Sequence, residues 1–212
     1  LEPEPEPLNN LHGAAALTYA HPGIKLSASG DIATKASAQL PGAFESGCFR
    51  TAQASDTVMQ KGVHSASFTV LQGRHVLFGV LKHGWRDVDG GSAPFEVEGH
   101  CFLSAFDGRR YPGRRMWRGI ESYQVPAALN TSIRLLLDLD KGSMSVYKDD
   151  SLLGVLQASG LVQEGGLCWA VALVDEGDSV RVQRDDVVVL TPPTVDELWE
   201  AEMWEADCIG RQ

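Results

Sequence analysis

Two glutamates that are two residues apart form the pattern in this sequence that is closest to a catalytic site. Glu96 and Glu98 flank Val97, and on a β-strand this spacing would place both carboxylates on one face. Some β-sandwich enzymes cleave glycosides with one carboxylic acid as the general acid and a second as the nucleophile. A third acidic residue is missing here, because residues 99–101 read Gly-His-Cys. We interpret the pair as an exposed strand end, and a glycan-binding or glycan-hydrolysing domain is the alternative.

Other catalytic and cofactor-binding patterns are absent from the sequence. It has no GxSxG motif, no GxGxxG motif and no P-loop, and its six histidines never occur at a metal-ligand spacing. Its aspartates at turns do not have EF-hand spacing. The four cysteines lie far apart, and we expect Cys101 and Cys168, inside apolar runs, to be buried free thiols. The sequence therefore predicts neither catalysis nor a cofactor or metal.

An arginine-rich segment is the strongest candidate for recognition. Five arginines fall within ten residues, alongside three large apolar or aromatic side chains: Arg109, Arg110, Arg114, Arg115 and Arg118, with Tyr111, Met116 and Trp117. Guanidinium groups bind carboxylates and phosphates with paired hydrogen bonds. The segment is either a docking site for an acidic or phosphorylated partner, a solvated loop, or a clamp on the acidic C-terminal helix of the same chain.

The overall charge limits the class of partner. The formal net charge is −10, which disfavours nucleic acid as the main partner because phosphate binding needs a basic surface. We find neither a signal peptide nor an apolar run long enough to cross a bilayer. We expect an intracellular, cytoplasmic protein that does not contact a membrane.

The elements that must position these residues read as short strands separated by turns. The strand-like segments are Gly47–Thr51, His64–Leu71, Val76–Leu81, His100–Phe106, Leu167–Val174 and Ser179–Gln183, with a further candidate at Val187–Leu190. Ala66, Phe68 and Val70 alternate along one of them, as expected when one face is buried. A turn every eight to twelve residues predicts an all-β, two-sheet antiparallel sandwich.

Residues 132–156 contain the clearest strand pattern in the chain. Apolar residues alternate up to Leu139, a turn follows at Asp140-Lys141-Gly142, and Met144, Val146 and Tyr147 form the return strand. A second polar turn then leads into Leu152–Leu156. Such a three-strand meander needs a second sheet to bury its apolar face.

This meander resembles the SPRY domain family, which has a concanavalin-like jelly-roll fold. The resembling residues are Leu137-Asp138-Leu139-Asp140, Lys141-Gly142, Tyr147 and Leu153-Gly154, together with Phe78–Val80, Asp107-Gly108-Arg109-Arg110-Tyr111 and Trp169-Ala170-Val171. The resemblance spans Cys48 to Val182. Asp149-Asp150 stands where the family often has Asn-Gly, so we expect a longer turn or one of another type.

The resemblance implies a non-catalytic protein–protein interaction module that binds a protein or short peptide through loops at one end. Carried onto this sequence, the contacts would be Arg50, Thr51 and Ala52 after the first core strand, Tyr111, and Val174, Asp175, Glu176 and Gly177 in the last hairpin. Arg109 and Arg110 from the arginine-rich segment and Trp85 from a Gly-rich loop are further candidates. The family's Trp-Gly in the last loop is replaced by Asp175-Glu176, which disfavours acidic ligands there.

Composition divides the chain into four parts. Residues 1–10 read as an acidic Pro-Glu linker, 11–46 as an N-terminal extension with weak edge strands, 47–191 as the sandwich and 192–212 as an acidic amphipathic helix. Thr194 and Glu197 form a capping box at the start of that helix. Its apolar stripe would comprise Val195, Leu198, Trp199, Met203 and Ala206. The helix either docks in cis or binds another chain, including a second copy of this one.

Overall fold

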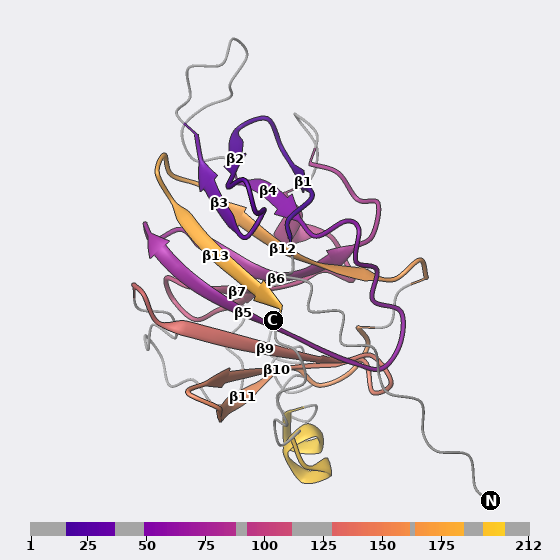
Figure 1. The fold of residues 1–212 in the computed structure, drawn as a ribbon. Helices are drawn as coiled ribbons and strands as arrows, with labels where there is room; N and C mark the ends of the chain where they lie inside the picture. The colour runs from indigo at the N-terminus through magenta and orange to yellow at the C-terminus, as the bar shows by residue number, and fades with distance from the viewer. Residues whose placement is uncertain are drawn as a thin grey trace, which may run out of the picture.

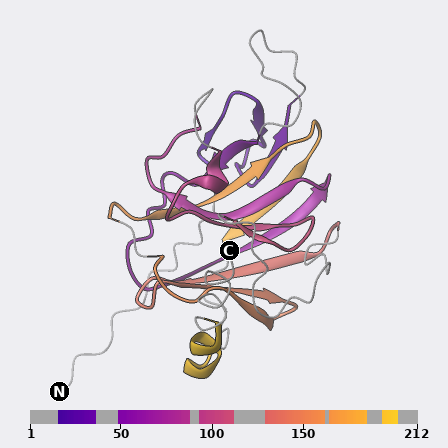
Figure 2. The ribbon, with the colours of Figure 1, turned by 180° about the vertical axis from the view of Figure 1, so that it is seen from behind.

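Two antiparallel sheets pack face to face in the computed structural model of the chain (Figure 1; Figure 2, from behind). The structure describes residues 16–36, 49–87, 93–111, 129–161, 164–184 and 193–201. Within these residues, no helix is long and apolar enough to cross a membrane. The predicted all-β sandwich with one C-terminal helix is confirmed.

Both sheets are formed by strands that are distant in the sequence. In the described residues, one sheet has six strands, in the order β1 (Tyr19–Ala20), β4 (Arg50–Gln53), β12 (Leu167–Leu173), β6 (Val76–Lys82), β7 (Cys101–Ser104) and β8 (Arg110–Tyr111). The other has seven, in the order β11 (Ser151–Gln157), β10 (Ser143–Lys148), β9 (Ser132–Asp138), β5 (Val63–Gln72), β13 (Ser179–Arg184), β3 (Ile32–Lys35) and β2 (Ile24–Leu26). The N-terminal strands therefore contribute to both sheets. The four-part division of the chain stays a prediction.

The core between the sheets is built from the alternating apolar residues. Ala66, Phe68 and Val70 are all buried on the inner face of β5, as the alternation predicts. The ring of Phe68 stacks on Phe78 of β6 at a centroid distance of 4.8 Å, and it meets Trp169 of β12 edge-on at 5.9 Å. These aromatic contacts join the two layers.

The outer face of the six-stranded sheet is also covered, which explains why β6 is apolar on both faces. Leu77, Leu81, Phe102 and Cys168 form a second buried cluster there. Four partly buried residues pack against this cluster: Phe49, Trp85, Ala93 and Tyr111. The predicted burial of the free thiols Cys101 and Cys168 is confirmed, and burial raises the pKa of Cys168 to about 12.

The meander forms as predicted, but its second turn differs from the prediction. Asp149 and Asp150 have φ angles of 50° and 61°, and Lys148 pairs directly with Ser151. The expectation of a longer turn is wrong, because both aspartates adopt the left-handed conformation that a two-residue hairpin requires. The Arg134 side chain of β9 donates a charge-assisted hydrogen bond to the Asp150 carboxylate beside this turn.

The carboxylate pair that resembled a catalytic site does not lie on a strand. Glu96 ends a short 3₁₀ helix, η1 (Pro94–Glu96), and Glu98 lies in the following turn. The expectation of two carboxylates on one strand face is therefore wrong. Pro94 explains the difference, because its fixed φ suits the start of a helical turn.

A short helix at residues 195–201 lies beside β11 (Figure 1). The predicted capping box is present: Thr194 N and Oγ1 donate to Glu197 Oε2 at 2.7 and 2.9 Å, and Glu197 N donates to Thr194 Oγ1 at 3.2 Å. Ala201 and Leu198 pack against Val155 and Ala158. Val195 and Trp199 of the predicted apolar stripe are exposed, so these two side chains do not dock on the sandwich. Met203, Ala206 and the predicted strand at 187–190 lie outside the described residues.

Candidate functional site at the loop end of the sandwich

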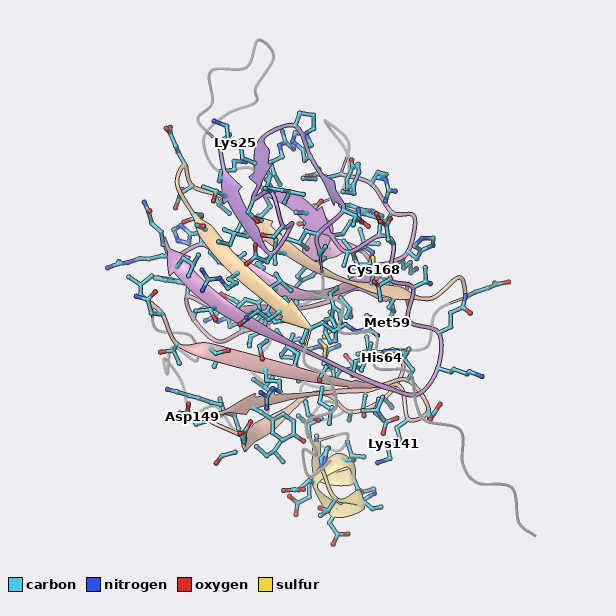
Figure 3. All side chains as sticks on the ribbon, viewed as in Figure 1. Lys25, Met59, His64, Lys141, Asp149 and Cys168 are labelled. Carbon is cyan, nitrogen blue, oxygen red and sulfur yellow. The ribbon has the colours of Figure 1, made fainter. Side chains whose placement is uncertain are left out.

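Strand register brings three connecting loops to one end of the sandwich. Leu173 pairs with Val76, and Leu77 pairs with Ser104, so the ends of β12, β6 and β7 lie together. The loop end is defined here as the segments 73–75, 105–109 and 174–178, which adjoin these strand ends. In Figure 3, Asp149 lies toward the same end, and His64 and Lys141 mark the opposite end.

Exposed side chains from all three loops contact one another. His75 Nδ1 lies 2.6 Å from Asp175 Oδ2, and because a carboxylate only accepts, the imidazole N–H donates. The His75 ring is 5.2 Å from the ring of Phe106. Phe106 is 46% exposed, and the side chains of His75 and Asp175 are about half exposed. An apolar ring and a hydrogen-bonded polar pair are thus presented side by side to solvent.

A buried carboxylate holds the β12–β13 loop in one conformation. Asp178 Oδ2 accepts the backbone N–H of Asp175 at 2.8 Å and of Val174 at 3.3 Å. A Cβ atom at Gly73 would lie only 1.7 Å from Asp178 Oδ1. The β5–β6 turn can therefore approach this loop only because residue 73 is glycine.

Strand β3 ties the same loop to the seven-stranded sheet. Lys35 N donates to Asp178 O at 2.8 Å, and Gly177 N donates to Lys35 O at 3.1 Å. The C-terminal end of the loop is thus hydrogen-bonded to β3, and its N-terminal end is hydrogen-bonded to the Asp178 carboxylate. A loop held in this way loses little conformational entropy when it binds a partner.

The described part of the arginine-rich segment lies partly at the loop end. Arg109 N donates to Asp107 Oδ1 at 3.1 Å, and Arg109 Nε lies 3.5 Å from Asp107 Oδ2, so the β7–β8 turn is closed by its own ion pair. Arg110 is half-buried in β8. Arg114, Arg115, Met116, Trp117 and Arg118 lie outside the described residues, so the clamp on the C-terminal helix stays a prediction.

The first predicted contact segment is a buried strand and not a loop. Thr51 and Ala52 are fully buried in β4, so their side chains cannot touch a partner directly. Arg50 is 9% exposed, and its Nη1 lies 3.6 Å from Asp87 Oδ1. Burial raises the pKa of Asp87, and the Arg50 guanidinium opposes that shift. The predicted strand Gly47–Thr51 continues to Gln53, so the contact loop expected at its end is itself strand.

Trp85 and Tyr111 lie on the outer face of the six-stranded sheet. Both pack against the cluster that contains Phe102, and Gln53 Nε2 donates to the backbone oxygen of Trp85 at 3.0 Å. Trp85 also meets His100 edge-on at 5.2 Å. Trp85 and Tyr111 thus cover a sheet face, whereas Arg109 and residues 174–177 belong to the loop-end segments.

Sequence reasoning did not find His75, Phe106 or Asp178. Phe106 carried a usable signal, because an aromatic residue directly before Asp107-Gly108 must sit at the start of a turn. His75 and Asp178 carried none, since both are ordinary polar residues between strands. Their roles depend on which loops the sheet order brings together.

No family model matches the sequence, and no curated protein matches it. Solved structures do: the SPRY domain of human HERC1 matches over 78% of this chain and 94% of that domain, with a TM-score of 0.56 and 16% identity. The chain has the SPRY fold. A second human SPRY domain covers 78% of this chain and 98% of its own, with a TM-score of 0.53 and 14% identity. The TRIM65 PSpry domain covers 79% and 85%, with a TM-score of 0.53 and 15% identity. The SPRY resemblance of the meander is thus confirmed at the level of fold.

Proposed function

We propose that this SPRY-fold chain is a protein-interaction module that binds a partner protein or peptide through the loop end. The contact of Phe106, His75 and Asp175 carries the proposal, because it joins three loops that the scaffold holds in place. Functional residues are commonly found on loops that a rigid scaffold positions. The predicted contacts Arg109, Asp175 and Glu176 are part of this surface.

The chemistry of the surface suits one anchor residue surrounded by polar contacts. Exposed aromatic side chains contribute most of the energy at many interfaces, and charged groups around them set orientation and partner choice. Phe106 would supply the apolar contact. Asp175 and Glu176 would disfavour acidic groups of the partner near them. Arg109 would favour acidic groups of the partner where it lies.

Differential capture tests the proposal. The wild-type chain, Phe106→Ala and the matched control Val63→Ala would be used as bait in parallel, with bound proteins quantified by mass spectrometry. Val63 is 58% exposed at the start of β5, at the opposite end, so its truncation removes a similar apolar surface elsewhere. Some proteins will bind to both wild type and Val63→Ala. We expect the bound amount of these proteins to fall at least about tenfold with Phe106→Ala, since an anchor residue contributes at least 1.4 kcal/mol to binding.

Thermal unfolding of all three baits serves as the control for folding. Both substitutions are at exposed positions, and we expect their midpoints to stay close to that of wild type. A set of bound proteins that is the same for Phe106→Ala and wild type would contradict the proposed site.

A further inference from the structure

A cleft separates strand β11 from the C-terminal helix. It has a volume of about 200 Å³. One wall is residues 152–155 of β11, and the other is formed by Glu197, Glu200 and Ala201 of the helix. Figure 1 shows the helix beside β11, at the edge of the seven-stranded sheet.

Both walls of the cleft are fixed by contacts already described. Leu198 and Ala201 pack on Val155 and Ala158, which attaches the helix to the strand. The capping box between Thr194 and Glu197 sets where the helix begins. Burial, together with the charge of Glu197, raises the pKa of the Tyr147 hydroxyl to about 12.

The size and lining of the cleft select one class of occupant. Sites for small-molecule ligands usually have volumes of about 300–1,000 Å³, so this cleft holds a side chain or two in place of a metabolite. Leu152, Leu153 and Val155 give it an apolar wall, and two carboxylates lie on the opposite wall. A side chain with a long aliphatic stem and a cationic end matches both walls at once.

The charge of the surrounding segment favours the same occupant. The helix residues 195–201 include three acidic residues, Asp196, Glu197 and Glu200, and no basic residue, within a chain of net charge −10. Such a field attracts basic segments and repels acidic ones before contact is made. Glu197 and Glu200 are three residues apart on the helix, so they lie on the same helix face, and both line the cleft.

We propose that this cleft is a second interaction site, which binds a basic peptide segment of a partner protein by accepting an Arg or Lys side chain. The aliphatic stem lies against Leu152, Leu153 and Val155, and the cationic end lies between Glu197 and Glu200. This site does not depend on the proposed role of the loop end.

Calorimetric titration of the full chain with a designed peptide pair tests the site. The probe is a ten-residue acetylated Gly/Ser/Leu peptide with three arginines, and its control has citrulline, a neutral isostere, at those positions. We expect the arginine peptide to bind at least tenfold more tightly than the citrulline peptide. We also expect Glu197→Gln with Glu200→Gln to weaken the arginine peptide at least tenfold, while Gln at 197 keeps the capping box.

A charge-matched control separates the cleft from the net charge of the protein. Asp56→Asn with Asp196→Asn also removes two exposed acidic groups, but neither residue lines the cleft. We expect less than a twofold change for this variant. Equal losses in the two double variants, equal binding of the two peptides, or no binding of the arginine peptide would each overturn the proposal. So would sedimentation of the free chain as a dimer that the arginine peptide dissociates, because a second copy would then occupy the cleft.

Discussion

His100 shows how a single buried side chain can make the stability of the fold depend on pH. It is 2% exposed, and its Nδ1 lies 2.7 Å from the backbone oxygen of Pro94. A carbonyl oxygen only accepts, so Nδ1 carries the proton and Nε2 is the bare nitrogen. Nε2 is buried and has no hydrogen-bond partner among the residues that the structure describes, and burial lowers the pKa of His100 to about 4.

We expect the free energy of unfolding to fall as the pH falls from about 6.5 to 4. The unfolded chain binds a proton at His100 with the ordinary pKa of 6.5, whereas the folded chain does so only near pH 4. The His100 contribution is thus complete above pH 6.5, and it decreases by about 2 kcal/mol between pH 7 and pH 5. Urea unfolding at these two pH values measures the decrease.

His100→Phe is the control for this titration, because it keeps a ring beside Trp85 and Phe102. Asp87, with its raised pKa, contributes with the opposite sign but is common to both proteins. We expect wild type to lose about 2 kcal/mol more than the variant over this pH range. An equal loss in both proteins would show that His100 titrates normally in the folded state.

At the residue scale, the sequence predicts burial better than it predicts partners. Phe68 and Cys168 could be placed in the interior because apolar runs and alternation depend on local spacing alone. The roles of Arg50 and Asp87 could not be predicted, since their contact joins residues 37 positions apart, and neither carries a local signal. The sequence therefore predicts Arg50 as an exposed contact residue, whereas in the structure Arg50 is buried and paired with Asp87.

At the scale of elements, the hairpins were the most predictable parts. Asp138 Oδ1 accepts the N–H groups of Asp140 and Lys141, each at 3.1 Å, so the first turn of the meander is stabilised by its own sequence. The prediction of a strand at Glu96–Glu98 was wrong, because an alternation over only three residues does not distinguish a strand from a turn.

A substitution at Gly73 tests how closely the β5–β6 turn approaches the β12–β13 loop. Gly73 and Gly160 both have positive φ, 92° and 85°, but a Cβ at Gly160 would meet nothing within 4 Å. Gly160→Ala therefore measures backbone strain alone, at about 1 kcal/mol. We expect Gly73→Ala to cost about 3 kcal/mol in urea unfolding, because Asp178 must also move away from two backbone N–H groups.

A double-mutant cycle identifies the cause of that difference. With Asp178→Ala already present, Gly73→Ala no longer meets a carboxylate, and its cost should fall toward that of Gly160→Ala. If Gly73→Ala lowered the free energy of unfolding equally with and without Asp178, contact with the Asp178 carboxylate would not be the cause of the larger loss.

At the scale of the whole molecule, the sequence predicted the sandwich but not the arrangement of its ends. Strand count and turn spacing indicate two sheets. Which loops share an end depends on the sheet order, in which β12 lies between β4 and β6, and that order is set by pairings across more than 80 residues. His75, Phe106 and Asp175 could therefore be recognised as one surface only in the folded structure.

Site-specific photo-crosslinking tests whether the loop end contacts the partner. A benzoylphenylalanine at Glu176 would leave Phe106 intact, and the same residue at Val63 would report on the opposite end. We predict a crosslinked partner from position 176 that disappears when Phe106→Ala is added, and little product from position 63. Equal yields from the two positions, or a product that persists with Phe106→Ala, would contradict a binding site at the loop end.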